Sequence, residues 1–233
     1  MSLARNAESH TQRGVSTVRI LRFMLNSLVV ISLVVASVVP PARSQAAPNP
    51  ARVAELKLAL RDLYINHIFW VRDLVMATRL GDKAAAGEAD EYGLKNATAV
   101  GQSIAPIYGQ AAGEKFAMLF TGHYAAVKGY MTAAFANNFK GSAAQKKAAV
   151  DRLLKNANDI AMFVSAANPN LPKDAVYGLL LTHGQQHIMM IDAVAKNDWA
   201  AEADSWDPMV KHIYTLSDAL AEGIAKQFPG KFQ

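Results

Sequence analysis

Apolar residues recur at intervals of three and four along most of the chain, and this spacing limits the possible folds more than any other feature. One run is Leu56, Leu60, Leu63, Ile68, Val71 and Val75, and another is Phe116, Leu119, Phe120, Tyr124, Val127 and Met131. Such spacing places apolar side chains on one face of an α-helix. No convincing alternation of apolar and polar residues, which is typical of strands, interrupts it. We therefore expect an all-α protein.

Residues that break helices divide this pattern at five points. The breaks are Gly81-Asp82, Tyr108-Gly109, residues 137–142, Asn168 to Pro172, and Asn197-Asp198. They predict six helices, at residues 52–80, 84–108, 113–137, 143–167, 173–197 and 200–227. Ser142-Ala-Ala-Gln145 matches a capping box at the start of the fourth helix. Pro106 weakens the second helix, and Pro208 is expected to start or kink the sixth.

The six expected helices resemble three copies of one helical pair. His67, His123 and His183 each precede a Gly or Asn by fourteen residues, namely Gly81, Asn137 and Asn197. In the second helix of each pair, Leu94-Lys95-Asn96-Ala97, Leu154-Lys155-Asn156-Ala157 and Val210-Lys211-His212-Ile213 also correspond. A repeat of about sixty residues suggests duplication of a hairpin that cannot bury its apolar face alone. The expected fold class is an up-and-down helical bundle of about six helices, built from three similar helical hairpins.

The N-terminal residues have the character of a secretory signal. Residues 1–22 carry four arginines and one acid, residues 23–39 are apolar, and Ser44 and Ala46 are small residues in the positions preferred before a cleavage site. We predict that residues 1–46 are a cleaved signal peptide and that residues 47–233 form a single helical-bundle domain, periplasmic or secreted. Without cleavage the apolar run would anchor the chain in the membrane, although its seventeen residues are at the lower limit for a span.

Loss of the signal changes the charge of the chain. The whole chain has a formal charge of +5, but the signal segment removes five arginines and one acid, which leaves 19 basic and 18 acidic residues. No other basic cluster is present, so we expect no nucleic-acid partner and no stable membrane insertion after cleavage. The chain has no cysteine, which excludes disulfides and thiolate metal ligands.

Four segments combine Gly, Asn, Pro and aromatic residues in a distinctive order. They are Tyr108-Gly109-Gln-Ala-Ala-Gly113, Asn156-Ala-Asn-Asp159-Ile160, Asn168-Pro169-Asn170-Leu-Pro172 and Gly223-Ile-Ala-Lys-Gln227-Phe228-Pro229-Gly-Lys-Phe232. With most of residues 55–232, they resemble a group of uncharacterised bacterial all-helical proteins familiar from bacilli. The resemblance implies a helical fold and matches His67, His123 and His183 to histidines of that group, whereas His212 is displaced from the group's last histidine.

Members of that group often carry the names glycosyltransferase or acetylglutamate kinase. The present sequence does not support these names, because it has no phosphate-binding Gly-rich loop after a strand and none of the strands that such enzymes require. The resemblance therefore implies a fold and no activity.

Each expected helical pair carries one histidine on its apolar stripe. The residues four before and four after each are Leu63 and Val71 for His67, Leu119 and Val127 for His123, and Leu179 and His187 for His183. Residues four apart share a helix face, so all three imidazoles are expected to face the core. A buried neutral imidazole needs partners for its ring nitrogens. Asn96, Asn156 and His212 lie at the matching points of the partner helices, and water or a metal are the other partners open to the imidazoles.

These histidines predict a metal site. Neutral imidazole is the commonest metal ligand, and bundle cores can collect ligands from facing helices. His183 and His187 are four residues apart and point the same way, so they could hold one Zn²⁺ or copper ion, with His67 or His123 completing the site. His212 is a further candidate ligand. Met189 and Met190 add sulfur nearby, which suits copper. Copper or zinc is thus the expected cofactor, and no protein partner is indicated.

Two other functions remain open. One is a metal-free structural or interaction module of the cell envelope, in which histidine and asparagine form a polar core layer. The other is a metal enzyme with an open coordination position, for which the sequence shows no recognisable acid, base or nucleophile. Haem held by two imidazoles is less favoured because no attachment motif is present. The Glu-x-x-His pairs of ferritin-like di-iron sites are absent.

Overall fold

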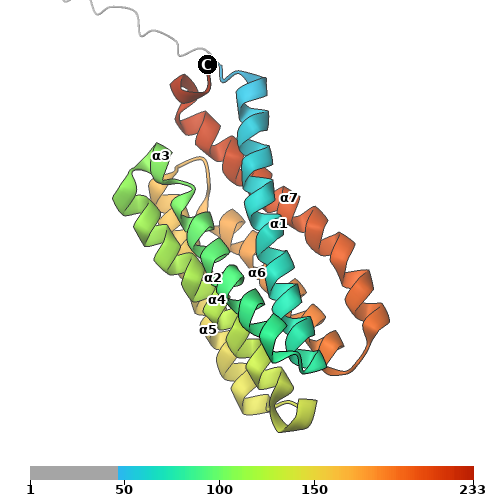
Figure 1. Ribbon diagram of the computed structural model, residues 1–233. Helices are drawn as coiled ribbons and strands as arrows, with labels where there is room; N and C mark the ends of the chain where they lie inside the picture. Colours follow the sequence, from blue (N-terminus) through green and yellow to red (C-terminus); the bar gives the residue numbers. More distant parts are fainter. Residues whose placement is uncertain (1–46) are drawn as a thin grey trace, which may run out of the picture. The chain divides into compact units, whose positions relative to one another are not determined.

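The chain forms long antiparallel helices joined by short turns (Figure 1). The computed structural model describes residues 47–233, and the expected signal peptide lies outside these residues. The elements are α1 (Pro50–Leu80), α2 (Lys83–Gln102), α3 (Ala105–Tyr108), α4 (Gln110–Phe139), α5 (Ala143–Ala167), α6 (Lys173–Ala195), α7 (Trp199–Gln227) and the 3-10 turn η1 (Pro229–Phe232). Within residues 47–233 there is no strand, which confirms the prediction of an all-α helical bundle.

At several predicted breaks, a glycine ends one helix or a capping side chain begins the next. Gly81 ends α1 in the left-handed conformation with φ 78°, and the Asp82 side chain accepts a hydrogen bond from the Ala85 amide at the start of α2. Ser142, from the predicted capping box, accepts a hydrogen bond from the Gln145 amide at the start of α5. These side chains satisfy amides that have no partner inside a helix, and so they fix where each helix begins.

The second predicted helix is shorter than expected. We predicted one helix over residues 84–108, but α2 ends at Gln102 and Ala105–Tyr108 forms the separate short helix α3. Pro106 explains the break, since it has no amide hydrogen to bond to the carbonyl of Gln102. Pro208 instead lies inside α7, which begins nine residues earlier at Trp199 and is capped by Asp198. Of the two expectations for Pro208, that it starts the sixth long helix is excluded, and α7 agrees with the predicted helix over residues 200–227.

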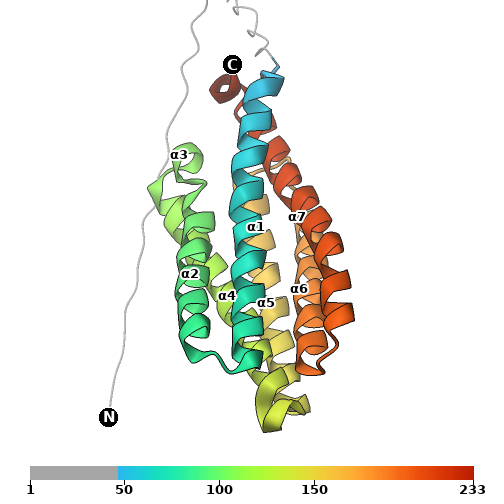
Figure 2. The same ribbon diagram turned by 45° about the vertical axis from the view of Figure 1, so that its right-hand side comes forward.

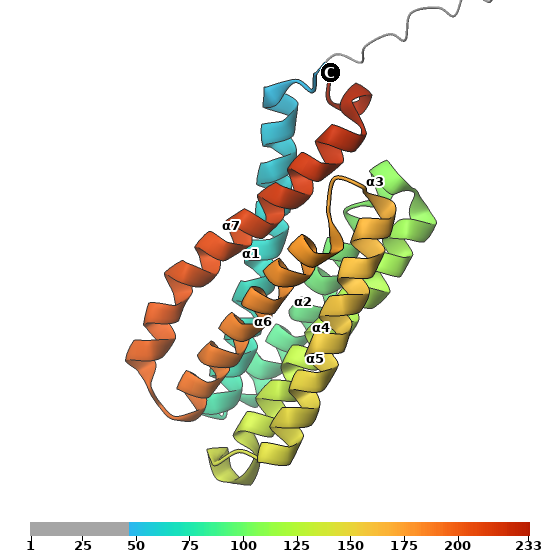
Figure 3. The same ribbon diagram turned by 180° about the vertical axis from the view of Figure 1, so that it is seen from behind.

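Three long helices lie at the centre of the bundle and three lie outside them. The central helices α1, α4 and α6 contact one another. Each outer helix packs between two central ones: α2 between α1 and α4, α5 between α4 and α6, and α7 between α6 and α1. Figure 2 shows α1 flanked by α2 and α7, and Figure 3 shows α6 between α7 and α5. The central helices are those that carry His67, His123 and His183.

Close helix contacts depend on small residues. A Cβ atom at Gly101 of α2 would lie 2.1 Å from the Cα of Ala117 in α4, and one at Gly93 would lie 2.6 Å from the Tyr124 hydroxyl.

The ends of the described chain also meet, because the Asn49 amide donates to the Phe232 carbonyl at 2.6 Å. None of the helices within residues 47–233 is long and apolar enough to cross a membrane.

Candidate metal centre

Four histidines from the three central helices converge in the core. His67 comes from α1, His123 from α4, and His183 and His187 from successive turns of α6. Their side chains are between 0% and 2% exposed. One ring nitrogen of each lies within 4.8 Å of the corresponding nitrogens of the other three. The structure thus brings together four of the five histidines that the sequence offers as metal ligands.

The four imidazole rings occupy the corners of a tetrahedron. His67, His123 and His183 form a nearly equilateral triangle, with ring centroids 5.7, 5.6 and 5.5 Å apart. The fourth ring, of His187, lies 5.5 Å from His67, 6.3 Å from His123 and 4.4 Å from His183. Metal–imidazole bonds of about 2.1 Å in a tetrahedral site place the nitrogens about 3.4 Å apart. A shift of about 1.4 Å at the longest separation would therefore complete the shell around one ion.

Most ring nitrogens in this cluster lack a hydrogen-bond partner among the described residues. The Nε2 atoms of His183 and His187 face each other at 3.1 Å. Both nitrogens of His67, both of His123 and the Nδ1 atoms of His183 and His187 are buried and unpaired. A buried polar atom without a partner costs about 1–3 kcal/mol. Six such atoms at one place need an explanation, and a metal ion would supply part of it, because it would bind one nitrogen of each ring and so account for at most four of the six.

Burial keeps these imidazoles in the uncharged form that binds metals. It lowers the pKa of His123 to about 4, although the neighbouring Asn156 amide raises it slightly. Burial and the nearby His123 lower the pKa of His187 to about 3. The pKa values of His67 and His183 also fall well below the usual 6.5, first because of burial and then because of the neighbouring imidazoles. At neutral pH every ring is uncharged and keeps one nitrogen lone pair, so the cluster need not lose charge-bearing protons to bind a metal. In the His183–His187 pair one of these lone pairs accepts the hydrogen bond, and an ion would take the place of that bond.

Apolar and aromatic side chains surround the cluster. The Phe120 ring packs edge-on against His67 with centroids 5.1 Å apart, and it lies 5.6 Å from the His123 ring. No carboxylate belongs to the group of candidate ligands among the described residues. Within the described residues the candidate ligands are therefore buried, all nitrogen and without a carboxylate.

The partner helices contact the histidine-bearing helices in an equivalent way in all three pairs. The Asn96 amide donates to the Leu63 carbonyl at 3.0 Å, the Asn156 amide donates to the Leu119 carbonyl at 2.9 Å, and His212 Nε2 donates to the Leu179 carbonyl at 2.9 Å. In each case the acceptor is four residues before the central histidine. These polar side chains bond to backbone carbonyls, and the Oδ1 atoms of Asn96 and Asn156 remain buried and unpaired.

His212 stays outside the group of four. Its ring is stacked on that of His183 with centroids 6.4 Å apart, and it is only partly buried. The two methionines that follow the ligand pair differ, since Met190 is 1% exposed and Met189 is 65% exposed. The sequence pattern paired His187 with His183 through their spacing of four residues, and it named His212 only through its correspondence to Asn96 and Asn156.

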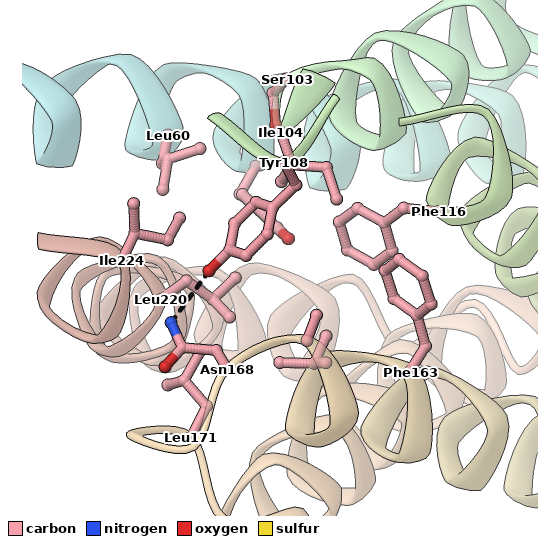
Figure 4. A pocket seen from close by; sticks show the side chains of 13 residues that line it. Leu60, Ser103, Ile104, Tyr108, Phe116, Phe163, Asn168, Leu171, Leu220 and Ile224 are labelled. Carbon is pink, nitrogen blue, oxygen red and sulfur yellow. Dashed lines mark hydrogen bonds between the residues drawn. The ribbon is translucent and has the colours of Figure 1, made fainter. Parts of the chain in front are cut away.

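A small apolar cavity lies at the end of the bundle that contains α3, and no histidine lines it (Figure 4). It measures about 30 Å³, and a second cavity of about 20 Å³ shares several of its lining residues. Two polar side chains that line it are hydrogen-bonded: the Tyr108 hydroxyl donates to Gln227 at 2.7 Å and accepts from the Asn168 amide at 2.9 Å. The histidine cluster, which gathers four potential metal ligands, is therefore the stronger candidate for a functional site.

Comparison with protein-family models, with curated proteins and with solved structures finds no match to this chain.

Proposed function

We propose that this chain is an exported helical bundle that binds one transition-metal ion, copper or zinc, through His67, His123, His183 and His187. The observation that carries the proposal is the tetrahedron of four buried imidazoles with six unpaired ring nitrogens. Imidazole suits both metals, and a bundle core can hold ligands from facing helices. The N-terminal segment supports export to the periplasm or beyond, because it has arginines, then an apolar run, then small residues before the expected cleavage site.

The ligand set favours a carrier or store over a catalyst. Catalytic metal sites usually keep one coordination position for water or substrate and place an acid or base beside it. Here four imidazoles are available for one ion, and no carboxylate joins them among the described residues. A closed site of this kind holds its ion and does not expose it to a substrate.

The second candidate is a metal-free structural module with a histidine and asparagine polar layer. The contact in its favour is the His183–His187 bond at 3.1 Å, which satisfies one nitrogen of each ring without a metal. This candidate leaves all six other nitrogens unpaired, whereas one metal ion would bind one nitrogen of each ring. In a metal-free module each of these atoms would stay buried without a partner and would lower the stability of the fold.

We also propose that the three helical pairs are copies of one ancestral hairpin. The three equivalent hydrogen bonds to carbonyls support this origin. Gly81, Asn137 and Asn197, each fourteen residues after its histidine, have positive φ angles of 78°, 54° and 61°. Membership in the bacterial helical group that the sequence resembles is likewise a proposal, supported by the helical fold.

The direct test is elemental analysis of untagged protein purified from its native export compartment. The proposal expects about one copper or zinc ion per chain, lost in a His183→Ala/His187→Ala variant that still gives a helical circular dichroism spectrum. His212→Ala is the matched control, because this imidazole lies outside the group of four, and it should keep the metal. Wild-type protein that contains no metal and takes up neither copper nor zinc would refute the proposal.

A further inference from the structure

We propose that the ion for which this centre is built is monovalent copper, Cu⁺, rather than Zn²⁺ or Cu²⁺. The inference rests on the proposed function, namely that the four histidines form one metal site. Two independent features of the cluster lead to it: the arrangement of the rings in space, and the absence of any negative charge.

The arrangement of the rings disfavours Cu²⁺. In a square of ligands the two diagonals exceed the four sides by about 1.4-fold, and Cu²⁺ prefers such planar or tetragonal sites. The six centroid separations here run from 4.4 to 6.3 Å, and only the His123–His187 separation exceeds 5.7 Å. Ligands at the corners of a tetrahedron suit Zn²⁺ and Cu⁺, whose filled d shells impose no planar geometry.

The charge of the site separates Cu⁺ from Zn²⁺. All four ligands are neutral imidazoles that are at most 2% exposed, so the complex would carry the full charge of its ion into an apolar core. The energy of burying a charge rises with its square, and a divalent ion is therefore penalised about four times as heavily as a monovalent one. Zinc sites avoid this penalty with thiolate or carboxylate ligands or an open water position. This site has none of them among its described residues.

The surroundings do not supply the missing anion. Among the described residues no carboxylate oxygen joins the ring nitrogens of the four histidines. Carboxylates elsewhere on the bundle already have cationic partners: Glu202 pairs with Arg72, Asp90 with Lys128 and Asp192 with Lys146. The ion would be bound by neutral nitrogen, with the Phe120 ring packed against the His67 ligand.

The test is competition between Cu⁺ and Zn²⁺ for the full mature protein under anaerobic conditions, with Cu⁺ buffered by a colorimetric chelator. We expect one Cu⁺ per chain, without a paramagnetic resonance signal, and complete displacement of Zn²⁺ at equal free concentrations. Such displacement requires at least about a 100-fold difference in affinity. Zn²⁺ that binds as tightly as Cu⁺, or copper that is retained as paramagnetic Cu²⁺, would overturn the inference and leave the proposed function standing. Binding of neither ion would overturn both.

An isosteric variant tests the charge argument itself. The Asn156 side chain lies beside the His123 segment, since a Cβ on Gly122 would be 3.2 Å from its Nδ2 atom. Asn156→Asp adds a carboxylate there without changing size, and we expect it to shift the ratio of affinities toward Zn²⁺ by at least about tenfold. Asn156→Ala is the control, because it loses the same hydrogen bond to the Leu119 carbonyl without adding charge. If the two folded variants have the same ratio of Cu⁺ affinity to Zn²⁺ affinity, the charge argument is contradicted.

Discussion

At the scale of single residues, the core keeps polar atoms that a purely structural core would not retain. His67 is fully buried and neither of its ring nitrogens has a partner. An apolar side chain of similar volume would fill the same space without that loss. The imidazole therefore reduces the stability of the metal-free protein, which is typical of residues kept for binding.

Replacing this imidazole should stabilise the metal-free protein. We expect His67→Leu to raise the free energy of unfolding by about 1–3 kcal/mol, because the unpaired nitrogens disappear and the volume is kept. The same variant should bind metal more weakly, since one of four ligands is lost. Urea unfolding of the metal-free proteins and metal titration would measure the two effects. A loss of stability in His67→Leu would favour the metal-free polar layer instead.

Part of the site follows from single-residue positions and part does not. The neighbours four residues away predicted that His67, His123 and His183 face the core, and all three are buried. The spacing of four residues within one helix paired His187 with His183, but whether His212 reaches the cluster depends on how α7 lies against α6, which that spacing does not contain. The hydrogen bonds of Asn96 and Asn156 to backbone carbonyls could not be predicted either, because each joins two different helices.

At the scale of helices, the α2–α4 contact depends on the lack of a side chain at Gly101. We expect Gly101→Ala to lower the free energy of unfolding by at least about 1–3 kcal/mol, because the added Cβ would lie 2.1 Å from backbone atoms that must move. Gly87→Ala in the same helix is the matched control. A Cβ there meets nothing within 4 Å, and it should stabilise the helix by about 0.5–1 kcal/mol. Thermal unfolding that ranks the two variants in the opposite order would contradict the described packing.

The helix ends were more predictable than the helix contacts. Caps such as Ser142 and the turn at Gly81 act through atoms a few residues away, so a local sequence pattern can reveal them. The sequence predicts that Pro106 weakens the second helix, but whether the helix bends or breaks there depends on the packing around it. The Gly101–Ala117 contact joins different helices and has no local signal.

At the scale of the whole molecule, three central helices bring four imidazoles to one point, and this makes stability depend on pH. The pKa values of His123 and His187 are about 4 and about 3 in the fold, below the value near 6.5 of an unfolded chain. The unfolded chain therefore binds more protons below pH 6.5, and stability is present above that pH and is lost as the pH falls toward the folded values.

The expected consequence is a steep loss of stability of the metal-free protein between pH 6.5 and pH 4. Each histidine that stays neutral in the fold contributes a slope of about 1.4 kcal/mol per pH unit. His187→Leu should remove one such contribution and give a shallower dependence. Urea unfolding at a series of pH values would measure both slopes. Equal stability at pH 7 and pH 5 would show that the four imidazoles are not held neutral.

The central claim is that the four histidines together ligate one ion, and X-ray absorption at the metal edge of the loaded protein tests it most directly. We predict a shell of three or four imidazole nitrogens at about 2.0–2.1 Å, altered in His183→Ala/His187→Ala and unchanged in His212→Ala. A shell of oxygen ligands, identical in the wild type and in both variants, would show that the metal binds elsewhere and would contradict the claim.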